Sequence, residues 1–489
     1  MTTETEIKLS LSARAASQLA KQAILGGVEP QRQLLVNTYY DTADKRLRCE
    51  RIVVRHRQKG RQCLLTVKTA PLLTAGLAQR SEWEGPGQLG TFDFSHVDDA
   101  SVRELLESLR DHLQPIFTTH FRRNVWLLEP RQGVRIELAL DRGWIDIGGA
   151  RQTIREVELE LLAGQVSDLF EAVVELQSSL PLHPEVCSKS ERAYRLLADA
   201  PLTAAKALPV AIEASMPAVG AFRLIALSCL NHLQSNENGV CQSDEPEFVH
   251  QARVAIRRLR SAIRLWESLL PEAFVARFDP LWQELATRLG DTRNWDVFLA
   301  ETLPALAEAF PGRGEIDRLS RHARTRCAGS RRASIRALKS AEYSRLLVDF
   351  TAAVLALPEA GAGRLAGFVP RCLKKRARRV NERAVDALGS DVEARHRLRV
   401  AFKQLRYAVE FFTPLLAGPQ LADYHQSAAC LQELLGRLND LAVAAELTAE
   451  TLPGGKGAVI ENWLAAKSES LLPEFRKFLN HFQQQQAPW

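Results

Sequence analysis

The sequence contains no apolar run long enough to cross a membrane, which takes about 20 consecutive residues. Only 8 of its 489 residues are cysteine, and no two of them form a CxxC pair. Their scatter argues against both a structural zinc site and a disulfide framework, and it is typical of a reducing cytoplasm. The first residues are acidic and polar together, unlike those of a secretory signal peptide. We therefore expect a cytoplasmic protein with no membrane partner.

Aromatic residues are also scarce, at 7% of the chain with only 6 tyrosines. Proteins that bind single-stranded nucleic acid interleave aromatic and basic side chains, and this interleaving is missing here. No helix-turn-helix spacing stands out, so the sequence argues against nucleic acid as the ligand. No serine or cysteine lies in a triad-like context, which argues against a covalent catalytic intermediate.

Charge, in contrast, is abundant. The chain has 64 Lys and Arg against 58 Asp and Glu, a net charge of +6 and an isoelectric point near 8.9. With 46% hydrophobic and 25% charged residues, its composition is that of a globular protein. Its length predicts about two to four domains.

The first charged pattern is Glu4-Thr5-Glu6-Ile7-Lys8. A β-strand turns every second side chain to the same face, so Glu4, Glu6 and Lys8 share one face of a strand. Carboxylates placed in this way can hold a divalent metal, and a lysine beside them can hold the anion that the metal binds. A solvated edge strand is the alternative for this stretch alone.

Similar alternation recurs along the first half of the chain. After a helix expected from Ser12 to about Leu25, closed by Gly26-Gly27, strands are expected at 34–36, 39–42, 52–57, 64–68, 80–84, 121–127, 134–141 and 154–161. One face of several later strands is charged, with Arg55 and Arg57, Lys68, then Arg80, Glu82 and Glu84, then Arg135, Glu137 and Asp141, and finally Glu156, Glu158 and Glu160. The 121–127 strand sets Arg123, Val125 and Leu127 on one face and Arg122 and Asn124 on the other.

About eight strands are enough to close a barrel, and the charged faces carry both signs at matched spacing. A closed barrel with a charged interior is expensive unless a ligand or water fills it. Carboxylates combined with a surplus of Arg and Lys suit a metal chelated by a polyanion with several phosphates.

These residues resemble a CYTH domain of the triphosphate tunnel metalloenzymes, over about residues 1–200. The resemblance rests on an ordered set: the ExExK motif of Glu4, Glu6 and Lys8, then Tyr40-Asp41-Thr42, Arg55-x-Arg57, Leu64-Leu65-Thr66-Val67-Lys68, Arg80-x-Glu82-x-Glu84, Glu137 with Asp141, Glu156-x-Glu158-x-Glu160, and Lys189.

The resemblance implies an eight-stranded antiparallel tunnel that binds triphosphates with Mg²⁺ or Mn²⁺ as cofactor. It implies that the metals face Glu4, Glu6, Glu158 and Glu160. It implies that phosphate oxygens face Lys8, Arg55, Arg57, Lys68, Arg80, Arg135 and Lys189. Catalysis is then expected from Glu4, Glu6, Lys8, Arg55, Arg57 and Lys68, by in-line attack of water on the terminal phosphorus.

The second half reads as helical, after an Ala- and Pro-rich linker at 201–217. Within 218–489 two stretches match: His250 to Arg260 aligns with His396 to Arg406, and Leu289-Gly290 aligns with Leu435-Gly436. Both offsets are equal, since 396 − 250 = 436 − 290 = 146. A constant offset indicates a duplicated helical unit, about 218–363 and 364–489.

Each copy places basic side chains on one narrow helix face. These are His250, Arg253, Arg257, Arg260 and Arg264 in the first copy and His396, Arg399, Lys403 and Arg406 in the second, where Glu410 stands at the position of Arg264. Like charges at these spacings repel each other, so the stripe favours a polyanion site over a merely solvated face.

This half resembles a CHAD domain, over about 218–489, through the two His-x-x-Arg-x-x-x-Arg/Lys-x-x-Arg motifs and the 290–297 and 436–443 segments. Where the family usually has Arg-Asp-x-Asp-Val, this chain has Arg293-Asn294-Trp295-Asp296-Val297. The resemblance implies that both basic helices bind inorganic polyphosphate. Further basic clusters that could extend this surface are Arg318, Arg321, Arg324, Arg331 and Arg332, and Arg371, Lys374, Lys375, Arg378 and Arg379.

The fold class expected is therefore α+β, a β tunnel followed by an all-α domain. The leading functional hypothesis is a metal-dependent inorganic triphosphatase that cleaves tripolyphosphate to pyrophosphate and phosphate, with a polyphosphate-binding helical module. The alternatives are a tunnel enzyme acting on an organic triphosphate (adenylate cyclase or thiamine triphosphatase) and a non-catalytic polyphosphate-binding scaffold. The preferred metal, the general base and the oligomeric state stay open.

Overall fold

The structure, a computed structural model, describes residues 2–69, 72–74, 76–198, 201–359, 363–389, 391–416, 420–485, 487 and 489. Contacts divide it into two compact units. The first contains Met1–Leu202 together with Lys339–Ala356, and the second contains Thr203–Leu338 with Leu357–Trp489. Each unit is described by itself below.

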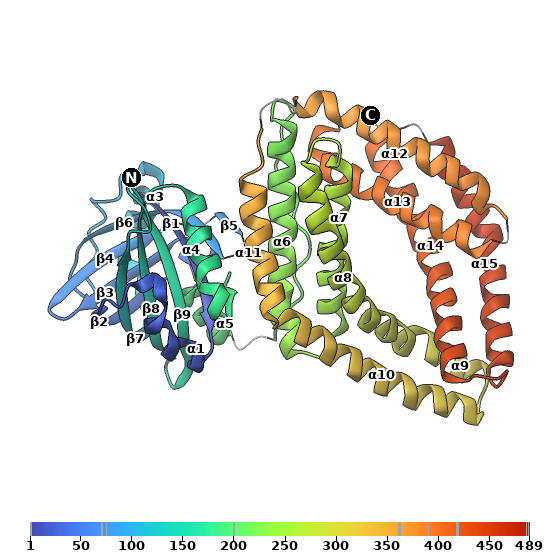
Figure 1. The fold of residues 1–489 in the computed structure, drawn as a ribbon, viewed down its shortest axis with the longest axis horizontal. Helices are drawn as coiled ribbons and strands as arrows, with labels where there is room; N and C mark the ends of the chain where they lie inside the picture. Colours follow the sequence, from blue (N-terminus) through green and yellow to red (C-terminus); the bar gives the residue numbers. More distant parts are fainter. Residues whose placement is uncertain are drawn as a thin grey trace. The chain divides into compact units, whose positions relative to one another are not determined.

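The first unit is built on one antiparallel sheet (Figure 1). Its strands are β1 (Thr2–Leu11), β2 (Gln31–Asp41), β3 (Val53–Lys59), β4 (Gln62–Lys68), β5 (Leu72–Thr74), β6 (Leu77–Pro86), β7 (Gln114–Leu128), β8 (Arg135–Ile147), β9 (Ala150–Ala163) and β10 (Leu182–Pro184). Their order is β10-β1-β9-β8-β7-β2-β3-β4-β6-β5, and β1 also pairs with β6. That pairing closes eight strands into the expected antiparallel barrel, with β5 and β10 added at its side.

The alternation in β1 explains which face is polar. Ile7 and Leu9 point outward into a fully buried apolar cluster, while Glu6 and Lys8 point inward. Helices cover the outside of the barrel, where some complete that cluster and the others pack into two further apolar clusters. They are α1 (Ala13–Gln18), α2 (Arg46–Cys49), α3 (Ala100–Leu109), α4 (Val166–Ser179) and α5 (Lys189–Ala198), with 3₁₀ turns η1 (Leu19–Lys21), η2 (Ala23–Leu25) and η3 (Arg110–His112).

Two expected elements differ in detail. The helix expected from Ser12 to Leu25 is α1 followed by two 3₁₀ turns, with extended backbone at Gln22 between them. Leu19 and Leu25 would lie about 120° apart around one straight helix, because six residues rotate by about 600°. The break lets both enter the same core cluster. The strands expected at 34–36 and 39–42 are one strand, β2, with a register shift against β7 between Tyr39 and Tyr40.

One helix of the first unit comes from far along the chain. Helix α11 (Ala341–Leu355) packs against α4 and β10, and its Val348 is fully buried in the cluster outside the barrel. The sequence placed these residues in the helical half, so the expected boundary and the observed contacts differ here. The tunnel unit is discontinuous in sequence.

The second unit is entirely helical where the structure describes it (Figure 1). Its helices are α6 (Ala218–Gln242), α7 (Pro246–Trp266), α8 (Glu272–Val297), α9 (Leu303–Ala309), α10 (Gly314–Leu338), α12 (Leu365–Ala387), α13 (Val392–Phe412), α14 (Gln420–Thr451) and α15 (Ala458–Gln484), with a π turn η4 (Phe298–Thr302) and a 3₁₀ turn η5 (Thr413–Leu415). Helices α7 and α13 begin and end 146 residues apart, since 392 − 246 = 412 − 266 = 146. No helix among the described residues is long and apolar enough to span a membrane.

Trp266 lies at the centre of this helical unit. Its fully buried ring contacts Phe222 of α6, Phe368 of α12 and Phe412 of α13, at centroid distances of 5.9, 5.0 and 5.4 Å. Its indole N–H donates to the carbonyl of Ala218 at 2.7 Å. Side chains from both sequence copies therefore share one core.

The segment expected to link the halves has neither helix nor strand at 203–216. It lies against α6, where the Ala205 N–H donates to Asn236 Oδ1 at 3.0 Å and Ile212 is buried.

Candidate functional site

The inward side chains of the barrel surround a cavity of about 570 Å³. Charged residues from most of the strands reach it, because the strands alternate polar-in and apolar-out. Of the residues expected to act in the tunnel, its lining contains Glu4, Glu6, Lys8, Arg55, Arg57, Lys68, Arg80, Glu158, Glu160 and Lys189.

The carboxylates of β1 are held by cations of neighbouring strands. Arg80 donates from Nε to Glu4 Oε2 and from Nη2 to Glu6 Oε1, both at 2.7 Å. Lys68 Nζ lies 3.0 Å from Glu4 Oε2 and 2.8 Å from Glu82 Oε2. In this state Arg80 therefore orients the two β1 carboxylates, which fixes the ExExK strand in the cavity wall.

Lys8 and Lys189 both approach Glu158. Lys8 Nζ lies 3.4 Å from Glu158 Oε1, and Lys189 Nζ lies 3.0 Å from the same atom. Burial alone would lower the pKa of Lys8, but Glu6, Glu158 and Glu156 outweigh it and raise that pKa. Burial acts on Glu158 in the opposite sense, and Lys189, Lys8 and Arg123 overcome it and hold its pKa well below the usual range. Both groups are therefore charged at neutral pH.

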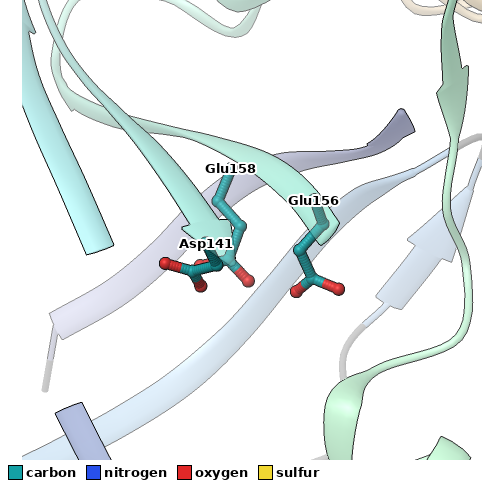
Figure 2. A group of neighbouring side chains, drawn as sticks. All are labelled: Asp141, Glu156 and Glu158. Carbon is teal, nitrogen blue, oxygen red and sulfur yellow. The ribbon is translucent and has the colours of Figure 1, made fainter. Parts of the chain in front are cut away.

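Three carboxylates of β8 and β9 gather beside Lys189. Figure 2 shows Asp141, Glu156 and Glu158, whose oxygens lie within 4.8 Å of one another. Lys189 contacts all three, Arg123 contacts Asp141 and Glu158, and Arg192 contacts Glu156. With Lys8, four cations thus surround three anions, and the cluster anchors Lys189 in the cavity wall.

Arg123 of β7 is a cavity residue that the sequence analysis missed. Its guanidinium donates to Asp141 at 2.8 and 2.7 Å and also contacts Glu158. The observation that identifies it is the strand pairing: Arg123 lies directly opposite Asp141 in the β7–β8 register. Alternation within its own strand groups Arg123 with Val125 and Leu127, and this pattern gives no indication of an acidic partner on the next strand.

Arg135 is not among the cavity-lining residues. It is the first residue of β8, its side chain is exposed, and the β8–β9 register shifts between Arg135 and Ile136. The sequence argument counted alternate residues back from Asp141, and a register shift breaks that count.

A surplus of carboxylate charge surrounds Glu160. Within the described residues, neither Glu160 nor Glu137 forms an ion pair, although both line the cavity. Burial, together with the nearby Glu4 and Glu137, raises the pKa of Glu160 to about 7. Clustered carboxylates without a matching cation suit a divalent metal, whose preferred ligands are carboxylate oxygens. Of the four donors expected for a metal, Glu160 therefore fits one as it stands, whereas Glu4, Glu6 and Glu158 would exchange their present cation partners for it.

Arginines crowd another part of the cavity. Arg57 donates to Asn37 Oδ1 at 3.0 Å, and burial with the nearby Arg55 and Arg123 lowers its pKa to about 10. Within the described residues, Nε and Nη2 of Arg55 have no hydrogen-bond acceptor, although Nη2 lies 3.7 Å from Glu82 Oε1 in a long ion pair. Burial raises the pKa of Tyr39, but Arg55 and its basic neighbours outweigh it and lower that pKa. Buried guanidinium donors without acceptors form a binding site for an anion.

A second cavity, of about 610 Å³, lies between the duplicated helices of the other unit. Helices α7, α8, α13 and α14 line it. The expected basic residues in its lining are His250, Arg253, Arg257, Arg260, Arg264, His396, Arg399 and Lys403, and Arg293 of α8 joins them. Arg406 does not line it: its Nη1 lies 3.1 Å from Glu410 Oε2, and its guanidinium lies over the Tyr407 ring.

The outer and inner arginines of this cavity differ in their partners. Arg260 and Arg264 are paired with Asp279, at 2.8 and 3.2 Å. The inner cations lack such neutralisation: burial and the nearby Arg257, Arg399 and Arg253 lower the pKa of Lys403 to about 6. Burial and basic neighbours also lower the pKa of Arg253 to about 10 and that of His250 to about 4. The inner cavity is therefore lined by closely spaced basic groups. At neutral pH Arg253 is charged, while Lys403 and His250 are largely neutral.

Most of the further basic clusters lie on exposed helix faces of α10 and α12. Arg331 is the exception, because it is buried and donates to Asp296 Oδ1 at 3.0 Å. Asp296 is the acidic residue kept in the altered Arg293–Val297 run, so that run supports the helix packing through Arg331.

Comparison with known proteins agrees with both geometries. Residues 2–194 match the CYTH domain family and residues 224–449 match the CHAD domain family. The chain is a CYTH–CHAD protein. Both cavities thus lie within recognised domains, the first in the CYTH domain and the second in the CHAD domain.

Two relatives are informative. An inorganic triphosphatase of Haemophilus influenzae is 37% identical over 203 residues, which cover 40% of this chain and 55% of that protein. The match thus spans little more than half of that relative. The crystal structure of the CHAD domain from the plant Ricinus communis is 32% identical, with a TM-score of 0.52, and covers 59% of this chain and 99% of that one.

Proposed function

We propose that the CYTH domain hydrolyses inorganic triphosphate with a divalent metal ion, Mg²⁺ or Mn²⁺. One observation carries this proposal: Glu137 and Glu160, which form no ion pair within the described residues, face the same cavity as two Arg55 nitrogens that have no hydrogen-bond acceptor there. A metal–triphosphate complex supplies the missing cation to the first and the missing anion to the second. The similarity to the Haemophilus influenzae triphosphatase supports the same chemistry.

Different side chains of the cavity would bind the metal and the phosphate groups. Glu4, Glu6, Glu158 and Glu160 would hold the metal, which when bound neutralises phosphate oxygens and acidifies a water. Arg55, Arg57 and Arg123 bind phosphate oxygens and stabilise the negative charge that spreads over them during transfer. Lys8, Lys68 and Lys189 add positive charge along the cavity.

Water is the nucleophile in this proposal. Among the described cavity residues there is no histidine or cysteine, and the only hydroxyls besides Tyr39 belong to Ser188 and Ser190. Those two serines hydrogen-bond to each other at 2.9 Å, with no base activating either. Direct attack of water on the terminal phosphorus, in line with the leaving pyrophosphate, needs no protein nucleophile.

The cavity favours a substrate without a base. Its aromatic lining residues, Tyr39 and Phe121, are 4% and 2% exposed and pack in the wall. A nucleobase or thiazolium ring would find charged side chains and no open stacking platform. We therefore place tripolyphosphate ahead of ATP and thiamine triphosphate as substrate.

We further propose that the CHAD domain binds longer inorganic polyphosphate in the cavity between α7 and α13. The mutual repulsion of Arg253, Arg257, Arg399 and Lys403 supports this, because a polyanion relieves it. The two domains would then act on one class of ligand in one cytoplasmic protein.

The test is phosphate release from tripolyphosphate, ATP and thiamine triphosphate in Mg²⁺ and in Mn²⁺. The wild type is compared with a Glu4→Gln, Glu6→Gln double variant and with Glu29→Gln, an exposed control whose side chain is 87% exposed. We expect tripolyphosphate to be cleaved fastest, the control to be unaffected and the double variant to be inactive. Tight polyphosphate binding with no turnover of any substrate would instead favour the scaffold function.

A further inference from the structure

Helix α11 presents one face to the CYTH domain, although its residues lie within the sequence of the CHAD domain. Ser344, Val348, Ala352 and Leu355 follow each other at intervals of three or four residues and so share one stripe. Val348 is fully buried among the residues that cover the barrel, and Ala352 and Leu355 pack against the same cluster. This stripe is part of the core that holds the tunnel.

The same face also makes a polar contact with β10. Ser344 Oγ and His183 Nδ1 are hydrogen-bonded at 2.9 Å. The rings of Tyr343 and His183 lie side by side, with centroids 5.9 Å apart. Helix α11 therefore holds the middle residue of the three-residue strand β10 from outside.

Strand β10 leads directly to two lysines of the cavity. It pairs with β1 at Ser10 and His183, and the N–H of Glu185 donates to the carbonyl of Lys8 at 2.8 Å. A few residues later Lys189 begins α5, and its Nζ lies 2.8 Å from Asp141 Oδ2. Movement of β10 would therefore displace both Lys8 and Lys189.

A strand of three residues at the end of a sheet makes few ladder hydrogen bonds and is marginal by itself. The ordered conformation of β10 must therefore depend on the element that packs against its other side. In the described structure that side is covered by α11.

We propose that α11 is a positioning element of the CYTH site: by holding β10 it fixes Lys8 and Lys189 where they meet the triphosphate. The kinetic part of this inference rests on the proposed triphosphatase function, while its structural part does not. It makes Ser344 and Val348 positioning residues for a cavity that neither of them touches.

The experiment uses the full chain with Ser344→Ala and Val348→Ala. Ser344→Thr, which keeps the hydroxyl, serves as the conservative variant. Arg345→Ala is the matched control, because Arg345 lies on the exposed face of the same helix. Two quantities are measured: kcat and KM for tripolyphosphate, and amide hydrogen exchange over 182–189.

We expect the two alanine variants to raise KM about fivefold or more with a smaller change in kcat, since loss of about 1 kcal/mol of substrate binding is a factor of about five. Exchange at 182–189 should accelerate, while Ser344→Thr and Arg345→Ala should behave as wild type. Polyphosphate affinity of the CHAD domain should not change.

Unchanged KM in both alanine variants overturns the proposal, even if exchange accelerates, because α11 would then only stabilise the fold. If the wild type cleaves no triphosphate, the proposed function has failed and exchange decides alone. Acceleration confined to 182–189 then supports the link from α11 to Lys189, and wild-type exchange overturns it.

Discussion

Arg258 of α7 and Glu410 of α13 form an ion pair, with Nε 2.7 Å from Oε1, that joins the two sequence copies of the CHAD domain. The guanidinium side chain is 2% exposed and also lies over the Phe411 ring. Glu410 occupies the position of Arg264 in the other copy. The departure from the repeat is thus explained, because Glu410 neutralises a buried cation of the first copy.

Replacing Glu410 with alanine should therefore destabilise the CHAD domain. It leaves the charge of Arg258 buried and unpaired, at a cost of about 3–5 kcal/mol in the free energy of unfolding. Chemical denaturation followed by helical circular dichroism measures the loss. Glu382→Ala, which removes the partner of the exposed Arg378, is the control and should cost less than about 1 kcal/mol. Equal losses would contradict the assignment.

Polyphosphate binding should take up protons through Lys403. In the free protein its pKa is lowered from 10.5 to about 6, mainly by burial and then by Arg257, Arg399 and Arg253, so it is largely neutral at pH 8. A bound polyanion favours the charged form, and calorimetry in two buffers of different ionisation enthalpy measures the proton uptake. Lys403→Gln should remove most of that uptake.

The lowered pKa of Lys403 also determines whether the stability of the CHAD domain rises or falls with pH. Between about pH 6 and 10.5 the unfolded chain holds the Lys403 proton and the folded chain does not. This lysine therefore makes the free energy of unfolding rise with pH across that window. Below pH 6 Lys403 is charged in the folded protein too, and its destabilising effect is then complete. Denaturation at pH 6 and pH 9, wild type beside Lys403→Gln, checks the direction. A smaller pH dependence in the variant is expected.

Arg257 and Arg406 each belong to one of the two predicted basic stripes, but the fold places them differently. Arg257 lines the CHAD cavity, whereas Arg406 is paired with Glu410 outside it. Arg257→Ala should weaken polyphosphate binding about tenfold or more, because a charge-assisted contact is worth about 1.5–3 kcal/mol. Arg406→Ala should weaken it less than about threefold. Titration calorimetry at fixed salt gives both dissociation constants.

Arg123 and Arg135 give a matching comparison in the CYTH domain. Arg123 faces the cavity and contacts Asp141 and Glu158, while Arg135 is exposed. We expect Arg123→Ala to lower kcat/KM for tripolyphosphate about 100-fold or more, and Arg135→Ala to leave it near wild type. Circular dichroism should confirm that both variants are folded. The reverse order of effects would contradict the assignment of Arg123, and not Arg135, to the cavity.

Much of the CYTH cavity could be predicted because it follows from alternation within single strands. Glu4, Glu6 and Lys8 needed only the two-residue period of β1. What depends on neighbouring strands could not be predicted: Arg123 is recognisable only once Asp141 lies opposite it, and Arg135 is displaced by a register shift. The CHAD stripes were predicted from helical periodicity, but the pairing of Arg406 required the fold.

The contribution of α11 was beyond any local pattern. Val348 reads as an ordinary apolar residue of a helix, and nothing near it in the sequence indicates that it shares a core cluster with Leu9 and Leu182. Such contacts join distant segments, and only the assembled structure reveals them.

This discontinuity has a consequence for synthesis on the ribosome. Strand β10 ends at Pro184 and the helix that covers it ends at Leu355, so 355 − 184 = 171 residues separate them. At about 5–20 residues per second, the barrel waits roughly 9–34 seconds for α11. During that interval β10 and the apolar outside of α4 lack their cover. The CYTH domain, although first in the chain, is therefore finished late.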